Sequence, residues 1–69
     1  MPARPDDDVR RAIESLPMRQ RQVVVLRFYE DLTIEQIATD LGIGAGSVKT
    51  HLHRALKTLG TKLDERSLR

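Results

Sequence analysis

The fold of this chain is decided by residues 33–56, which read TIEQIATDLGIGAGSVKTHLHRAL. Thr33, followed three positions later by Gln36, has the pattern of a capping box, in which each residue satisfies a backbone N–H of the other at the start of a helix. Apolar residues then recur at helical spacing, at Ile34, Ile37, Ala38 and Leu41. Gly42 follows this stripe, where a left-handed residue ends many helices and glycine adopts that conformation most readily. The segment therefore predicts a short helix that begins at Thr33 and ends at Gly42.

A second and longer helix is expected to start near Gly44. With Leu52 as the reference and about 100° per residue, one apolar stripe lies within about 60° of Leu52. This stripe consists of Val48, Ala55, Leu56, Leu59 and Leu63. Gly60 lowers the stability of a helix by about 1 kcal/mol relative to Ala, so this helix is expected to fray after about residue 60.

Two further helices are expected before residue 30. Acidic residues 6–8 complement the positive end of a helix dipole, and the apolar residues after them predict a short helix near residues 7–15. Pro17 ends that helix and can open the next one, which is expected to run to about Tyr29. The valine run within it is compatible with helix or strand, and the length of the segment favours a helix. The predicted fold is all-α: a compact four-helix domain with a C-terminal helix-turn-helix.

Length and composition set the outer limits of function. With 69 residues the chain makes one small domain, expected over residues 9–63 between a flexible segment 1–8 and a flexible tail 64–69. The absence of cysteine excludes a disulfide, a thiolate zinc site and a thiol nucleophile. The longest apolar run, residues 23–26, is too short to cross a membrane, and the N-terminus has no apolar stretch typical of a signal peptide. A cytoplasmic protein without a membrane partner is expected.

Charge is distributed unevenly along the chain. The net charge of +2 hides an acidic stretch at residues 30–43, which has four acidic and no basic residues. Residues 44–69 carry six Lys or Arg against two acidic residues, a net charge of +4. A separate basic block of this kind favours a polyanionic partner.

The last two predicted helices form a helix-turn-helix pattern, with a three-residue turn that contains glycine. Ala38 is small enough to let the helices approach, and Val48 and Leu52 are expected to seat the second helix on the first. The outward face of the second helix then carries cations and hydrogen-bonding groups that suit phosphates and base edges. These residues are Ser47, Lys49, Thr50, His53, Arg54 and Lys57.

These residues also allow other interpretations. A face with Lys and Arg is often only a solvated face, and for Lys57 alone that interpretation is favoured, whereas Arg54 is central on the outward face. His51 and His53 lie about 200° apart on a helix and cannot share one metal ion. The chain shows neither a pair of carboxylates that predicts a pocket nor a glycine-rich phosphate loop. No enzymatic activity, catalytic residue, metal, cofactor or small-molecule substrate is therefore expected.

Three stretches carry a resemblance to a known family. Residues 16–23 read LPMRQRQV, residues 30–38 read EDLTIEQIA, and residues 46–56 read GSVKTHLHRAL. Over about residues 9–60 the chain resembles the C-terminal region 4 of bacterial sigma factors, above all the extracytoplasmic-function (ECF) group. The resemblance implies that the last helix binds the −35 element of double-stranded promoter DNA, as the domain of a sigma factor that directs RNA polymerase to promoters.

The resemblance also implies roles for individual residues. It places four at base edges or the nearby backbone, namely Lys49, Thr50, His53 and Arg54. It places five next to phosphates, namely Arg27, Thr33, Ser47, His51 and Lys57. The sequence departs from the family pattern at two of these positions: Lys49 stands where Arg is common, and His51 where Arg or Lys is common. Both departures concern the basic residues of the predicted DNA-binding helix.

The family further implies protein partners. The apolar surface of the first two helices is expected to dock the flap of the β subunit of the RNA polymerase core, and an anti-sigma factor is a possible further partner. The sigma region that melts and reads the −10 element has no counterpart here. The chain is therefore expected to be a fragment that does not initiate transcription alone.

Two alternatives remain open at the level of sequence. A LuxR-type response-regulator domain also carries a Val-Lys-Thr-His-Leu run in its recognition helix, and such domains dimerise on palindromes. Residues 30–33 and 53–56 favour the sigma interpretation over this one. The second alternative is a sigma-like module that binds only protein.

Overall fold

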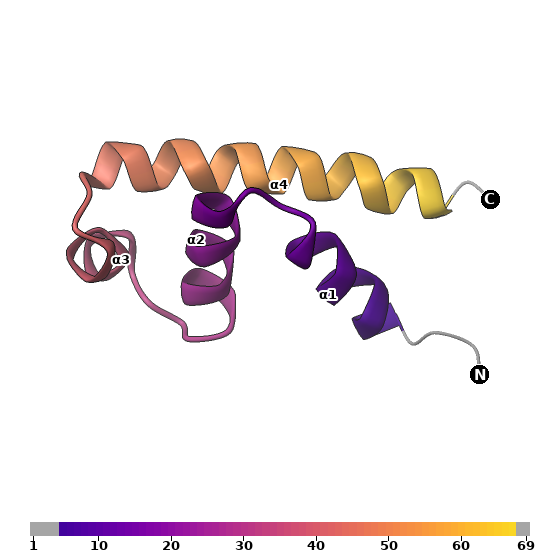
Figure 1. Cartoon of the computed structure of the whole chain (residues 1–69), viewed down its shortest axis with the longest axis horizontal. Helices are drawn as coiled ribbons and strands as arrows, with labels where there is room; N and C mark the ends of the chain where they lie inside the picture. The colour runs from indigo at the N-terminus through magenta and orange to yellow at the C-terminus, as the bar shows by residue number, and fades with distance from the viewer. Residues whose placement is uncertain (1–4, 68–69) are drawn as a thin grey trace.

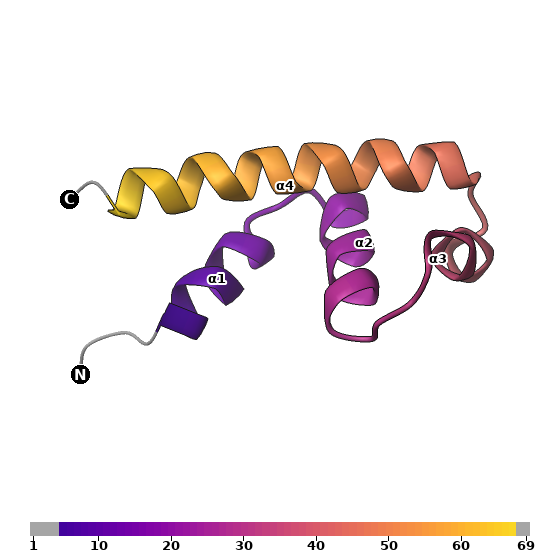
Figure 2. The ribbon, with the colours of Figure 1, turned by 180° about the vertical axis from the view of Figure 1, so that it is seen from behind.

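Four helices account for most of the chain. The computed structural model describes the backbone of residues 5–67 and the side chains of residues 8–60. The helices are α1 (Pro5–Glu14), α2 (Met18–Phe28), α3 (Ile34–Leu41) and α4 (Ala45–Ser67). No strand occurs within residues 5–67, and the all-α prediction is confirmed. Helices α1, α2 and α3 all lie on one side of the long helix α4, as the opposite views in Figure 1 and Figure 2 show.

The outer helices are longer than the sequence predicted. Helix α1 begins at Pro5, since proline suits a first helical turn and acidic residues follow it. Helix α4 continues through Gly60 to Ser67, because one glycine weakens a helix by only about 1 kcal/mol and good helix formers follow it. Residues 5–8 and 64–67, expected in flexible segments, are thus helical, while residues 1–4 and 68–69 lie outside the described residues.

Both ends of α3 have the predicted chemistry. Thr33 Oγ1 accepts the N–H of Gln36 at 3.1 Å, and Gln36 Oε1 accepts the N–H of Thr33 at 2.8 Å, which completes the capping box. At the other end Gly42 adopts a left-handed conformation with φ of 69°. The N–H of Ile43 then donates to the carbonyl of Ala38 at 3.0 Å. Local hydrogen bonds therefore determine where this helix begins and ends.

Replacement of Thr33 by alanine is expected to lower the free energy of unfolding by about 1 kcal/mol, because the N–H of Gln36 loses its acceptor. Urea unfolding followed by circular dichroism measures this change. Thr39→Ala is the matched control, since Thr39 is an exposed residue inside α3 whose hydroxyl donates only to the carbonyl of Glu35 within that helix, at 3.0 Å. That control is expected to be neutral or slightly stabilising. An equal loss for both variants would contradict a role for the cap.

Helix α2 lies between two hydrophobic clusters. One cluster joins α1, α2 and α4, and its buried residues are Ala12, Ile13, Leu16, Val24, Ala55 and Leu59. The other joins α2, α3 and α4 around three buried residues, Val23, Ile37 and Val48. Neighbouring valines thus serve different clusters, and Leu52 packs against both. A helix with two buried sides needs consecutive apolar residues, which explains the valine run.

One residue of the apolar stripe of α4 is not buried. Val48 and Ala55 are fully buried and Leu59 is 8% exposed, but Leu56 is 45% exposed. The buried arc is centred about 40° from Leu52 toward Val48 and Ala55, which leaves Leu56 about 80° away from its centre. The side of α4 that packs on the other helices is therefore rotated around the helix axis relative to the centre of the apolar stripe. The side chain of Leu63 lies outside the described residues.

Candidate nucleic-acid interface

The interface is built on the packing of α3 against α4. The two helices are joined by residues 42–44 only, in agreement with the predicted three-residue turn. Ile37 of α3 and Val48 of α4 are both fully buried, and Ala38 and Leu52 pack partly buried against the same cluster. The predicted seat of α4 on α3 is therefore present. This packing holds the first half of α4 at a set orientation to the rest of the domain.

The polar face of α4 points away from the other helices. Six residues predicted to face outward are exposed, namely Ser47, Lys49, Thr50, His53, Arg54 and Lys57, whereas His51 is half-buried. Helices α1, α2 and α3 leave this side of α4 uncovered (Figure 1 and Figure 2). From residue 47 to residue 57 the helix rises about 15 Å, close to the roughly 12 Å width of a DNA major groove. The structure thus brings all four predicted base-edge residues onto one accessible surface.

Thr50 has a defined orientation on this face. Its hydroxyl donates to the carbonyl of Gly46 at 3.0 Å, one turn earlier in α4. A hydroxyl that donates in this way keeps its oxygen available as an acceptor. Thr50 therefore keeps an acceptor available on this exposed face.

The structure separates Arg27 from the α4 residues. Arg27 is in the last turn of α2, and that end of the helix lies away from α4 in both Figure 1 and Figure 2. Its Nη1 donates to the carbonyl of Leu32 at 3.2 Å, so the guanidinium holds the α2–α3 connection. Thr33 caps α3 with its oxygen, and its hydroxyl proton can still donate. A phosphate contact at either residue stays a prediction.

Acidic and basic residues are segregated onto different helices of the domain. Helix α3 carries the acidic residues Glu35 and Asp40, both exposed, while residues 45–60 of α4 carry basic residues and no acidic one. Fields of opposite sign therefore arise from adjacent helices. The cationic side of the pair is the outward face of α4.

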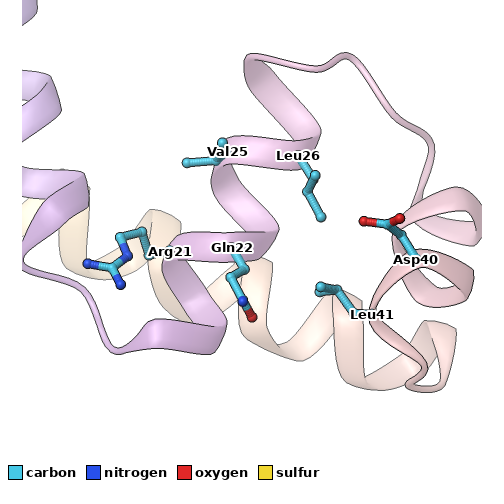
Figure 3. Close-up of a pocket in the computed structure, with 6 residues that line it drawn as sticks. All are labelled: Arg21, Gln22, Val25, Leu26, Asp40 and Leu41. Carbon is cyan, nitrogen blue, oxygen red and sulfur yellow. The ribbon is translucent and has the colours of Figure 1, made fainter.

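Three exposed apolar residues on or next to α2 were not among the predicted site residues. Met18 is 66%, Phe28 is 58% and Tyr29, just after the helix, is 63% exposed. An open groove of about 320 Å³ lies between α2 and α3, lined by Arg21, Gln22, Val25, Leu26, Asp40 and Leu41. In Figure 3, Leu26 of α2 and the α3 residues Asp40 and Leu41 point toward the same space. The adjacent aromatic residues at the end of the predicted helix are the sequence signal that could have found this surface.

Two features of the described residues bear on other classes of function. None of the helices, as far as their residues are described, is long and apolar enough to cross a membrane. The described part of the chain also has no group of three or more His, Cys, Asp or Glu placed to hold a metal ion.

A short helix, a three-residue turn and a longer helix with an exposed cationic face define a helix-turn-helix domain. Comparison with protein families narrows this class. The family described as "Sigma-70, region 4" matches residues 6–59, most of the chain. The chain therefore belongs to the sigma-70 region 4 family.

Individual relatives agree with this family. The chain is 41% identical over 63 residues to the RNA polymerase sigma factor SigV of Bacillus subtilis, a match that covers 91% of this chain and 38% of SigV. It is 47% identical over 57 residues to the RNA polymerase sigma-E factor of Streptomyces antibioticus, covering 83% of this chain and 32% of that protein. It is 41% identical over 54 residues to the ECF RNA polymerase sigma factor SigL of Mycobacterium tuberculosis, covering 78% and 30%. The chain thus spans about a third of the length of these relatives. These matches support the sigma interpretation over the LuxR-type alternative.

Proposed function

We propose that this chain binds the −35 element of double-stranded promoter DNA as the C-terminal domain of a sigma factor, and so helps direct RNA polymerase to promoters. The observation that carries the proposal is the exposed cationic face of α4, on a helix-turn-helix that belongs to the sigma-70 region 4 family. A helix seated in this way can enter the major groove, where base pairs present distinct donors and acceptors. The function requires no catalysis, and it would be exercised in the cytoplasm, where promoter DNA is found.

The predicted DNA-binding residues fall into two groups, one proposed to contact base edges and the other phosphates. Following the resemblance to sigma factors, Lys49, Thr50, His53 and Arg54 are assigned to base edges and the nearby backbone, and all four are exposed within two turns of the helix. Ser47, His51 and Lys57 flank them and are assigned to phosphates. Arg27 and Thr33, which come from α2 and the start of α3, would contact phosphates from outside α4. Phosphate contacts supply affinity and orientation, and base contacts supply specificity.

Selection of bound sequences from a random duplex pool tests this function. The 69-residue chain is expected to enrich one asymmetric motif, because a single helix-turn-helix reads one site. A palindromic motif would support a LuxR-type regulator instead. Absence of enrichment at low salt, where phosphate contacts are strongest, would support a module that binds only protein.

We further propose that the apolar surface of α2 docks the flap of the RNA polymerase β subunit. The support is the exposure of Met18, Phe28 and Tyr29 together with the groove between α2 and α3. Exposed apolar side chains and open grooves are both typical of protein interaction sites. This surface lies on a different helix from the proposed DNA-binding face, so one domain could hold both partners. An anti-sigma factor that covers either surface would block the function.

Phe28→Ala is expected to weaken binding to the isolated β flap at least about tenfold, because aromatic residues often dominate such interfaces. Titration of the labelled flap with the chain measures this effect. The melting temperature and the affinity for DNA should stay near those of the unchanged chain, since Phe28 is 58% exposed. Leu56→Ala is the matched control, because Leu56 is an exposed apolar residue of α4 and not of α2. Equal flap affinity for Phe28→Ala and the unchanged chain would rule out this surface.

A further inference from the structure

Gly46 occupies an unusual place on the outward face of α4. It is the second residue of that helix and is exposed. At about 100° per residue it lies about 160° around the helix from the centre of the buried arc formed by Val48, Ala55 and Leu59. Thr50 follows one turn later on the same side. Position 46 therefore faces away from the core, within the surface proposed to meet DNA.

The fold does not require glycine at this position. Among the described glycines only Gly42 has a positive φ, so the turn before α4 depends on Gly42 and not on Gly46. Apart from its chain neighbours and the adjacent helix backbone, a Cβ atom added at residue 46 would meet no atom within 4 Å. Glycine is also, apart from proline, the least favourable residue in a helix. Its presence therefore lowers helix stability without any packing contact that explains it.

We propose that Gly46 is the point where the DNA duplex lies directly against the backbone of α4. This inference rests on the proposed function and adds a residue that positions the helix in the groove. The Thr50 hydroxyl bonds to the Gly46 carbonyl at 3.0 Å, which folds the Thr50 side chain back along the helix toward the same spot. Side chains therefore project little from the helix at Gly46 and Thr50. The longer side chains of Lys49 and Arg54 extend further from the helix on either side of these two residues.

A methyl group at position 46 would hold the duplex away from the helix by on the order of 1 Å. Hydrogen bonds of about 2.9 Å from neighbouring side chains to DNA would then open beyond 3.5 Å, where they no longer count as bonds. The glycine thus lets the flanking side chains reach their partners. This access to DNA comes with a cost in helix stability, because glycine has a lower helix propensity than alanine.

Gly60 provides a matched control within the same helix. It is exposed, and a Cβ there would also meet no atom within 4 Å. It lies 14 positions after Gly46, or about 21 Å along the helix, which exceeds the roughly 12 Å width of a major groove. An alanine at position 60 therefore raises helix propensity outside the proposed DNA contact.

The experiment compares Gly46→Ala, Gly60→Ala and the unchanged 69-residue chain. Thermal melts by circular dichroism should show both variants at least as stable as the unchanged chain, with a rise of roughly 4 °C for Gly60→Ala, which lies in the helix interior. Fluorescence anisotropy at low salt, with the selected duplex, should show at least about tenfold weaker binding for Gly46→Ala and a change of less than about twofold for Gly60→Ala.

The possible outcomes separate this inference from the proposed function. If the unchanged chain binds the duplex and Gly46→Ala binds it equally well, the proposed function stands and the inference is wrong. An equal loss for both variants would also overturn the inference, because the effect would then not be local to position 46. If the unchanged chain binds no duplex, the proposed function fails, and the inference fails with it.

Discussion

Replacement of Ile37 by alanine is expected to lower the melting temperature of the domain by at least about 10 °C. Ile37 is fully buried and packs with Val23 and Val48, so its side chain joins α2, α3 and α4. Truncation of such a residue lowers the free energy of unfolding by about 2–5 kcal/mol, because a cavity remains. The whole free energy of unfolding of a domain this small is about 3–10 kcal/mol. The variant should therefore lose a large part of its folded population.

Thermal melts followed by circular dichroism at 222 nm would measure this loss. Leu56→Ala is the control, because it removes the same number of carbon atoms from a side chain that is 45% exposed. That variant should lose no more than about 1 kcal/mol, since much of the side chain already contacts water. Comparable losses for the two variants would show that the packing of α3 against α4 has been assigned incorrectly.

Arg54→Ala is expected to weaken binding to the matched −35 duplex by about 1–3 kcal/mol and to relax the preference at one base pair. Arg54 is exposed on α4, one turn after Thr50 and within the face that the other helices leave uncovered. A guanidinium in the major groove can donate two hydrogen bonds to the O6 and N7 atoms of guanine. Loss of this pair should therefore affect the matched sequence more than a scrambled one.

Anisotropy titrations on matched and scrambled duplexes over a range of salt concentrations would test this role. Lys57→Ala serves as the comparison, since a phosphate contact should weaken all sequences alike and reduce the salt slope by about one unit. If Arg54→Ala lowered the affinity equally on both duplexes, Arg54 would be a phosphate contact instead of a base contact. The contrast between the two variants thus separates specificity from general affinity.

Much of the candidate site was predictable because it depends on local spacing. The helical period alone placed Lys49, Thr50, His53 and Arg54 on the outward side of the helix, at least about 100° around it from the buried Val48, and all four are exposed. The same period could not find the apolar surface of α2, because Phe28 and Tyr29 are exposed by the position of neighbouring helices. The helical period also could not predict the hydrogen bond from Arg27 to the carbonyl of Leu32, because that bond depends on the path of the α2–α3 connection.

The sequence by itself determined the ends of α3 and the polar character of α4. Thr33, Gln36 and Gly42 act through hydrogen bonds and backbone conformations that span only a few residues, so their effect does not depend on the rest of the fold. Tertiary structure alone decided that Val23 and Val24 serve different clusters and that Leu56 faces solvent. Those outcomes depend on the direction from which α2 and α3 approach α4, and that direction results from packing among residues distant in the chain.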